Sequence, residues 1–343
     1  MRIALIADVH SNLIALEAVL SAIRKHAPDM IVSLGDQVNL GPCPRETLAM
    51  LKAEHVKCLH GNHERYILSA MAGHPGYRGA NFNQLRYNAS LLTAEEITFD
   101  KVMQVEHVTL CHALPDDDRF PVYDPGQALT ILKEKTLNAP THIICGHGHN
   151  PTNITSGSLR IESIGSVGCM DDAPPGVAPY ALLTIESGAA ALRPYYAAYD
   201  VRRIYPMYQR TGMPDYCPIM ARIACVQMMT NTDHIVPFVN AASALSKSRG
   251  ETSISEETWQ DADSAYPWPD GMTTAAFWKG RSLSGRCLFL LFKHRKPLVI
   301  PADHIAVVFR IAFKLFPLPD GMGLPVHEDE IRRLVRIELI IRQ

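Results

Sequence analysis

Short apolar runs alternate with amphipathic stretches along the first part of this chain. Residues 2–7, 30–34 and 56–60 are largely apolar and have the length of fully buried strands. Between the first two, apolar positions over 13–26 recur at the i, i+3, i+4 and i+7 spacing of a helix that packs on a sheet, and a second helix is expected over 45–54. This strand–helix–strand order predicts a parallel βαβ core with right-handed connections.

The pattern changes near residue 201. Before it, we expect further strands over 107–111, 141–145, 160–164, 180–185 and 191–196, and further helices over 65–71, 81–92 and 127–135. After it, the apolar spacing is helical, and Ser253 with Glu256 predicts a capping box for one of the helices. We therefore expect a domain over 1–200, a helical appendage over 201–280 and a tail over 281–343, whose role the sequence does not reveal.

An aspartate and a histidine follow the first predicted strand. Because Val9 separates Asp8 from His10, their side chains point to the same side of an extended chain, where they make half of a divalent-metal site. In open parallel sheets, sites gather beyond the carboxyl ends of the strands. Other apolar runs are also followed by residues whose side chains can bind a metal ion. These segments are Gly35-Asp36, Gly61-Asn62-His63-Glu64, Cys111-His112 and Gly146-His147-Gly148-His149.

This series resembles the motif blocks of the calcineurin-like metallophosphoesterase family. Those blocks are D-x-H, G-D, G-N-H-[DE], a lone His and G-H-x-H, and each occurs here in that order. The spacing is similar to that of the compact bacterial branch, which contains phosphodiesterases, phosphatases and diadenosine-tetraphosphate-type hydrolases. The resemblance, which covers about the first two hundred residues, implies an α/β fold in which a two-sheet βαβ sandwich is flanked by helices.

The resemblance also implies two divalent metal ions. Block by block, it gives one ion the ligands Asp8, His10 and His149, the other ion Asn62, His112 and His147, and both ions the bridging carboxylate of Asp36. One shared carboxylate, several neutral imidazoles and one amide oxygen hold two cations without overcharging the site. Mixed oxygen and nitrogen ligation suits Mn²⁺, iron or Zn²⁺ better than Mg²⁺. We favour Mn²⁺ for an assay, and the physiological pair of metals stays open.

In the family, the histidine of the G-N-H-[DE] block lies beside the leaving-group oxygen. His63 would therefore act as a general acid or stabilise developing charge, and Glu64 would orient its imidazole. Asn39 and His60 are candidates for substrate binding, although an ordinary hydrogen bond at a strand end explains His60 equally well. Asn12 is a third candidate, because it could order a ligand or touch phosphate, and helix capping explains it as well.

Composition indicates neither nucleic acid nor an anionic membrane as a partner, because the net charge is only −2. From Arg281 to the end, 11 Lys/Arg stand against 6 Asp/Glu, and such a mildly basic stretch is more often a solvated face than a binding patch. Eight cysteines without a CxxC pair suit reduced thiols, and neither a signal peptide nor a transmembrane run is visible. We expect a cytoplasmic protein, and a homo-oligomer stays open.

Two functions from different classes follow. The first is a dinuclear metal-dependent phosphoesterase that uses metal-activated water on a small phosphorylated substrate, with a phosphodiester or nucleotide favoured. The second is a metal-bound scaffold or regulatory module whose helical appendage docks a partner. Relatives with scaffold roles usually lose metal ligands or the residue that matches His63, and this chain keeps all of them, so we favour the enzyme.

Overall fold

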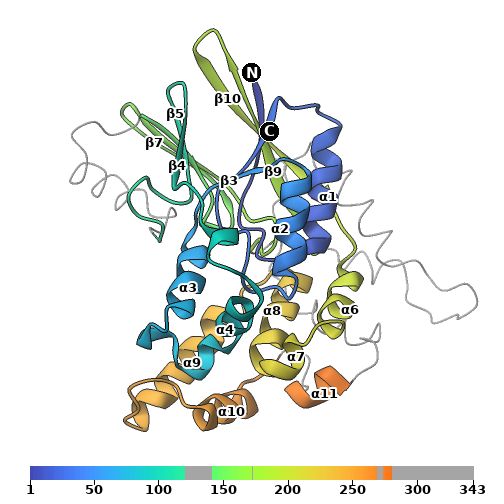
Figure 1. Cartoon of the computed structure of the whole chain (residues 1–343), viewed down its shortest axis with the longest axis vertical. Helices are drawn as coiled ribbons and strands as arrows, with labels where there is room; N and C mark the ends of the chain where they lie inside the picture. Colours follow the sequence, from blue (N-terminus) through green and yellow to red (C-terminus); the bar gives the residue numbers. More distant parts are fainter. Residues whose placement is uncertain (120–140, 172, 269–272, 280–343) are drawn as a thin grey trace, which may run out of the picture.

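The computed structural model describes residues 1–119, 141–171, 173–268 and 273–279, and it contains two five-stranded sheets with helices around them (Figure 1). The predicted α/β fold of two sheets, followed by a helical C-terminal region, is confirmed. The helix expected over 127–135 and the tail over 281–343 lie outside the described residues. Within the described ranges, no helix has the length and apolar character needed to cross a membrane.

The first sheet has the strand order β10-β9-β1-β2-β3. Its strands are β1 (Arg2–Ile6), β2 (Met30–Ser33), β3 (Lys57–Cys58), β9 (Val177–Glu186) and β10 (Ala189–Ala198). Strands β1, β2 and β3 run parallel, as the alternation of strands and helices predicted. Strand β9 pairs antiparallel with both β1 and β10, so the last two predicted strands form one long hairpin.

The second sheet has the strand order β4-β5-β6-β8-β7. Its strands are β4 (Val102–Val105), β5 (Val108–Cys111), β6 (His142–Cys145), β7 (Pro151–Ser156) and β8 (Leu159–Ile164). The three central strands are parallel, and β4 and β7 flank them antiparallel. The sequence did not predict these two edge strands, because each buries little: in β4 only Val105 is fully buried, and β7 mixes polar residues with a buried Ile154.

Alternate residues of β1 serve two different cores. Ile3 and Leu5 belong to the cluster between the two sheets, together with Leu110 of β5 and Ile144 of β6. Ala4 and Ile6 belong to the cluster on the other face, beneath the helices. Because both faces of the strand are covered, its sequence is continuously apolar instead of alternating between apolar and polar residues.

The helices of the first half are α1 (Leu13–Arg24), α2 (Pro44–Ala53), α3 (Asn62–Met71) and α4 (Asn83–Leu91). Short 3₁₀ turns occur at Pro75–Tyr77, Ala80–Phe82, Glu95–Ile97 and Val201–Arg203. Helix α1 packs against β9 and β10 and so covers the outer face of the first sheet. Helix α3 begins at Asn62, which places the G-N-H-[DE] block in its first turn.

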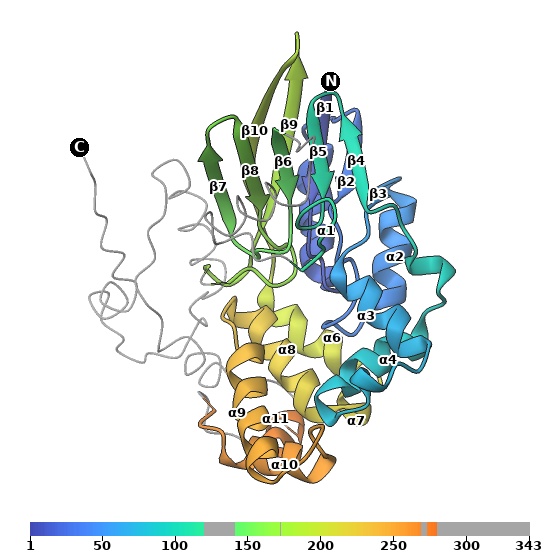
Figure 2. The ribbon, with the colours of Figure 1, turned by 90° about the vertical axis from the view of Figure 1, so that its left-hand side faces the viewer.

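The C-terminal region adds α6 (Ile204–Gln209), α7 (Met213–Tyr216), α8 (Pro218–Thr230), α9 (Ile235–Ser248), α10 (Glu256–Ala265) and α11 (Thr274–Lys279). These helices lie beyond one end of the two sheets (Figure 2). The predicted capping box at Ser253 is wrong, because Ser255 caps α10 and accepts a hydrogen bond from Thr258 N at 3.1 Å. The Glu251 carboxylate accepts from the Ser255 hydroxyl at 2.8 Å and so fixes this cap two residues later.

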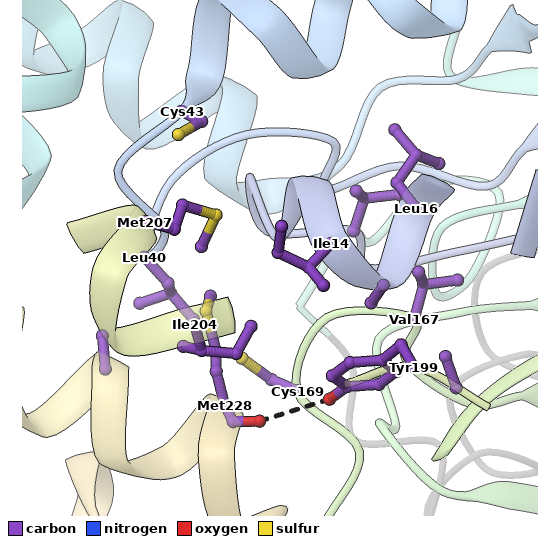
Figure 3. Close-up of a cluster of buried hydrophobic side chains, with 14 of the residues drawn as sticks. Ile14, Leu16, Leu40, Cys43, Val167, Cys169, Tyr199, Ile204, Met207 and Met228 are labelled. Carbon is purple, nitrogen blue, oxygen red and sulfur yellow. Dashed lines mark hydrogen bonds between the residues drawn. The ribbon is translucent and has the colours of Figure 1, made fainter. Parts of the chain in front are cut away.

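One hydrophobic cluster joins the C-terminal helices to the first sheet. Ile14 of α1, Ile204 of α6 and Met228 of α8 all belong to it (Figure 3). Tyr199, which directly follows β10, donates a hydrogen bond from its hydroxyl to Met228 O at 3.2 Å. All residues of α8 from Ile219 to Thr230 are buried, so this helix is central to the packing.

Replacing Met228 by alanine should lower the free energy of unfolding by about 2–5 kcal/mol, because its side chain is fully buried in this shared cluster. Urea unfolding measures the change, and amide hydrogen exchange should accelerate in both α1 and α8. The control is Val236→Ala on α9, where the side chain is 57% exposed, with an expected change within about 0.5 kcal/mol. Faster exchange in α8 alone would show that the helices unfold separately from the sheet.

Candidate metal centre

The seven residues predicted as metal ligands lie together where five chain segments meet. Asp8 and His10 come from the loop between β1 and α1, and Asp36 comes from the loop after β2. Asn62 is the first residue of α3, His112 directly follows β5, and His147 and His149 follow β6. Three groups of carboxylate and imidazole atoms form, each within 4.8 Å: Asp8, His10 and His149; His10, Asp36 and His63; and Asp36, His112 and His147.

Left-handed backbone conformations bring these side chains together. Asp8 and His10 have φ values of 52° and 49°, and Asp36 has 55°. Strand β1 already ends at Ile6, so the expectation that Asp8 and His10 converge because the chain is extended is wrong. Tight loops replace the strand, and hydrogen bonds from Asp8 N to Gly35 O and from His10 N to Asp36 O, both 3.0 Å, hold their backbones.

The first group fits a divalent cation by the chemistry of its donors. The Nε2 atoms of His10 and His149 are 3.1 Å apart, and Asp8 Oδ1 lies 4.0 Å from the first and 3.8 Å from the second. Asp8 Oδ1 is buried and has no hydrogen-bond partner in the described part of the chain. A buried carboxylate oxygen without a donor is costly, and a cation beside it removes that cost.

The second group fits a cation equally well. His112 Nδ1 lies 2.9 Å from Leu34 O, and because a carbonyl oxygen only accepts, Nδ1 carries hydrogen and Nε2 faces the site. Nε2 lies 2.8 Å from Asn62 Oδ1 and 3.3 Å from Asp36 Oδ2. A carbonyl that fixes the far nitrogen of a ring in this way is typical of metal-binding histidines.

The charges at Asp8, His147 and His149 point in the same direction, whereas His112 differs because it would have to lose a proton to bind a metal ion. Burial raises the pKa of Asp8 well above its usual range, so its anionic form needs a positive partner. Burial lowers the pKa of His147 to about 4 and of His149 to about 3, which keeps both rings in the neutral form that binds metals. Burial also opposes a charge on His112, but Asp36 outweighs it and raises the pKa of His112 to about 10.

Asp36 lies between the groups. Its Oδ2 is 3.3 Å from His112 Nε2 and 3.8 Å from His63 Nε2, while its Oδ1 accepts a hydrogen bond from His63 N at 2.8 Å. It belongs to two of the three groups of potential ligands. This central position is the one that a bridging carboxylate needs.

Glu64 lies elsewhere than expected. Its carboxylate accepts hydrogen bonds from Gly61 N, Asp36 N and Gln37 N, each at 2.9 Å. The expected contact with the His63 imidazole is made instead by Asn39, whose Nδ2 lies 2.7 Å from His63 Nδ1. Glu64 therefore fastens the start of α3 to the Asp36 loop, which sets where the ligands lie without touching the His63 ring.

Asn12 and His60 are the remaining candidates for substrate binding. Asn12 caps α1 by accepting from Ala15 N at 3.2 Å and donates from Nδ2 to Gly168 O at 3.0 Å, so both of its polar ends bind backbone. His60 is 8% exposed, and its Nδ1 is buried without a partner among the described residues. Neither residue belongs to the three groups of potential ligands.

Sequence reasoning missed two supports of the centre. The turn after β8 fastens the Asp8 loop: Gly168 N donates to Asp8 O at 2.9 Å, and the Ser166 hydroxyl donates to the same oxygen at 2.8 Å. Asp118 binds Arg65 of α3 through two hydrogen bonds of 2.7 and 2.8 Å. The first support left a signal in the Gly165-Ser166-Val167-Gly168 turn, whereas nothing in the sequence connects positions 65 and 118.

Comparison with known proteins agrees with this geometry. Residues 1–171 match the family model for calcineurin-like phosphoesterases, and through this part the chain belongs to that family. A metallophosphoesterase from Sphaerobacter thermophilus has a similar structure, with 25% identity and a TM-score of 0.52, over 66% of this chain and 99% of that one. A hypothetical protein from Pyrococcus horikoshii OT3 shares the fold at 16% identity and a TM-score of 0.53, over 68% of this chain and 99% of that one.

One curated relative also matches in sequence. An uncharacterized protein from Methanocaldococcus jannaschii is 39% identical over 66 residues, which are 19% of this chain. The matched part spans 27% of the length of that relative. The likeness therefore concerns one segment and assigns no activity.

Replacing Asp8 by asparagine should weaken divalent-metal binding by more than about 10-fold, because the change keeps the shape of the side chain and removes its charge. Isothermal titration of the metal-free protein with Mn²⁺ measures the affinity. Asp215→Asn on the exposed surface of α7 is the matched control and should bind as the wild type does. Equal affinity of the Asp8 and Asp215 variants would remove Asp8 from the ligand set.

Replacing Glu64 by glutamine should lower the free energy of unfolding by about 1–3 kcal/mol, because an amide group would face backbone N–H groups that the carboxylate now accepts. Urea unfolding of the metal-free protein is the measurement. Glu257→Gln, at an exposed position of α10, is the control. A Glu64 variant as stable as this control would show that the loop does not depend on the carboxylate.

Proposed function

We propose that the protein is a dinuclear metal-dependent hydrolase of phosphate esters. The observation that carries the proposal is the pair of donor groups on either side of Asp36, with the buried, unpartnered Asp8 Oδ1 in one of them. Membership of the calcineurin-like phosphoesterase family supports it. When bound, two divalent cations would supply an activated water and neutralise the charge of the phosphoryl oxygens.

The proposed ligands divide between the two ions as the motif blocks imply. Asp8, His10 and His149 would hold one ion, and Asn62, His112 and His147 the other, with Asp36 shared. Imidazole nitrogens outnumber carboxylates in this set, which favours Mn²⁺, iron or Zn²⁺ over Mg²⁺. We propose Mn²⁺ as the ion to use in an assay.

His63 is the proposed group at the leaving oxygen. Its side chain is 19% exposed, whereas those of Asp8 and His10 are fully buried, so His63 lies on the side of the centre that solvent reaches and from which a substrate would approach. Its Nε2 lies 3.8 Å from Asp36 Oδ2 and faces the groups of potential ligands. From this position it would donate a hydrogen bond to an oxygen of a bound ester. Asp36 and the other imidazoles would hold the two metal ions.

A phosphodiester or nucleotide is the substrate class that we propose. The arginine nearest to His63 in the sequence, Arg65, is held by Asp118 and so has its charge balanced. A diester brings one negative charge to the phosphorus, whereas a monoester brings up to two. A site whose neighbouring arginine is already paired therefore suits the diester better.

We also propose how the chain is divided, where the protein acts and what it binds. We propose a phosphoesterase domain over residues 1–200, a helical appendage over 201–280 and a basic tail of unassigned role over 281–343. All seven cysteines in the described residues are free thiols, which suits a reducing cytoplasm. A small phosphorylated compound is the proposed partner.

Hydrolysis of a chromogenic phosphodiester should depend on Mn²⁺, stop with EDTA, and exceed hydrolysis of the matching monoester. His63→Ala should lower kcat by about 10²–10⁴-fold, the usual range for loss of an acid–base group. His55→Ala, at an exposed position after α2, is the control and should keep full activity.

Two outcomes would contradict the proposal. Full activity of His63→Ala would remove His63 from the reaction. A wild-type protein that binds Mn²⁺ but hydrolyses neither ester nor a panel of dinucleoside polyphosphates would favour the scaffold function.

A further inference from the structure

We propose that Asn39 is a positioning residue that fixes the His63 imidazole with its Nε2–H toward the metal centre, so that His63 serves as a hydrogen-bond donor to the leaving oxygen. The inference rests on the proposed function and decides between the two roles that the sequence left open for His63. It also gives Asn39 a partner in the protein instead of a place in the substrate pocket.

The His63 ring spans the distance between Asn39 and the centre. Asn39 Nδ2 lies 2.7 Å from His63 Nδ1, and the opposite nitrogen, Nε2, lies 3.8 Å from Asp36 Oδ2. The centroids of the His63 and His10 rings are 4.7 Å apart. One nitrogen therefore contacts Asn39, and the other faces the groups that hold the metal.

The direction of the hydrogen bonds sets which nitrogen carries the hydrogen. Gln84 of α4, which is buried, donates from Nε2 to Asn39 Oδ1. An asparagine amide has one accepting end and one donating end, so Asn39 turns its NH₂ group to His63. An NH₂ group only donates, so Nδ1 of His63 accepts and the ring hydrogen lies on Nε2.

The backbone of Asn39 is held as firmly as its side chain. Asn39 and Leu40 have φ values of 78° and 60°, a region that asparagine tolerates better than most residues. Leu40 is buried in the cluster shared with the C-terminal helices, and the Tyr208 hydroxyl of α6 donates to Leu40 O at 3.2 Å. Asn39 itself is only 4% exposed, so little of it can meet a substrate.

The chemical consequence concerns the leaving group. Water's oxygen adds to phosphorus as one of its protons passes to solvent, and the bond from phosphorus to the leaving oxygen breaks with its electron pair on that oxygen. The His63 Nε2–H stabilises this developing negative charge and keeps its hydrogen, and solvent later supplies the proton. A fixed donor of this kind acts most strongly where charge appears in the transition state.

Nitrogen-15 NMR of the metal-free protein tests the hydrogen position directly, with the His63 signals assigned by their loss in His63→Gln. We expect Nδ1 to show the chemical shift of a ring nitrogen without hydrogen. We expect Nε2 to show that of a ring nitrogen that carries one. Asn39→Gly should reduce this preference, and Gln84→Leu, which leaves Asn39 in place, should reduce it less. A hydrogen on Nδ1 in the wild type would overturn the inference.

Kinetics supply the second readout. Asn39→Gly suits the positive φ and removes the amide, so we expect kcat to fall about 10-fold, the size of one hydrogen bond, with KM unchanged. The loss should be greater for an alkyl ester than for a nitrophenyl ester, because a poorer leaving group needs the donor more. A rise in KM with unchanged kcat would return Asn39 to substrate binding.

Asn231→Gly is the matched control. Asn231 is also a buried asparagine with positive φ, and its Nδ2 donates to Pro174 O at 2.8 Å, in the C-terminal cap of α8. Asn231→Gly should leave both the His63 signals and the leaving-group dependence unchanged. If kcat fell as far in Asn231→Gly as in Asn39→Gly, the loss in Asn39→Gly would reflect lower stability alone. If the wild type hydrolyses no ester, the proposed function fails, while the NMR measurement still decides the role of Asn39.

Discussion

The backbone of Asp8 is hydrogen-bonded to loops that follow a strand of each sheet, and the geometry of the centre depends on these bonds. Its N–H donates to Gly35 O after β2, and its carbonyl accepts from Gly168 N after β8. Left-handed conformations of non-glycine residues cost about 1–3 kcal/mol each and persist only where their surroundings hold them. The hydrogen bonds at Asp8 supply that constraint, and so loops that follow strands of both sheets present their side chains to one point.

The chemistry of the site could be predicted from the sequence because it depends on residue type and order. Each proposed ligand follows an apolar run. Such runs form strands independently of the conformation of the loops that follow them, as β1 and β6 show. The geometry could not be predicted in the same way. The alternation of an extended chain places Asp8 and His10 on one side, but their backbones have left the strand, and only the hydrogen bonds of distant loops determine where they point.

The same reason accounts for the contacts of His63 and Glu64. Adjacent positions in the sequence suggest that Glu64 orients His63, yet α3 turns the two side chains to different neighbours. Asn39 reaches His63 from 24 residues away, through a loop whose path depends on Leu40 and Tyr208. A local pattern also misplaced the cap of α10, because the Glu251 carboxylate, outside the pattern, selects Ser255.

Helix α8 is buried along almost its whole length, and its surroundings include both the first sheet and the remaining C-terminal helices. Such a helix cannot be exchanged as a module. A graft of the first two hundred residues onto another protein would leave the cluster that contains Ile14 and Leu40 without its members from α6 and α8. A graft of foreign helices would have to reproduce the surface that receives them. The two halves of the chain are therefore expected to diverge together, with substitutions in one matched by substitutions in the other.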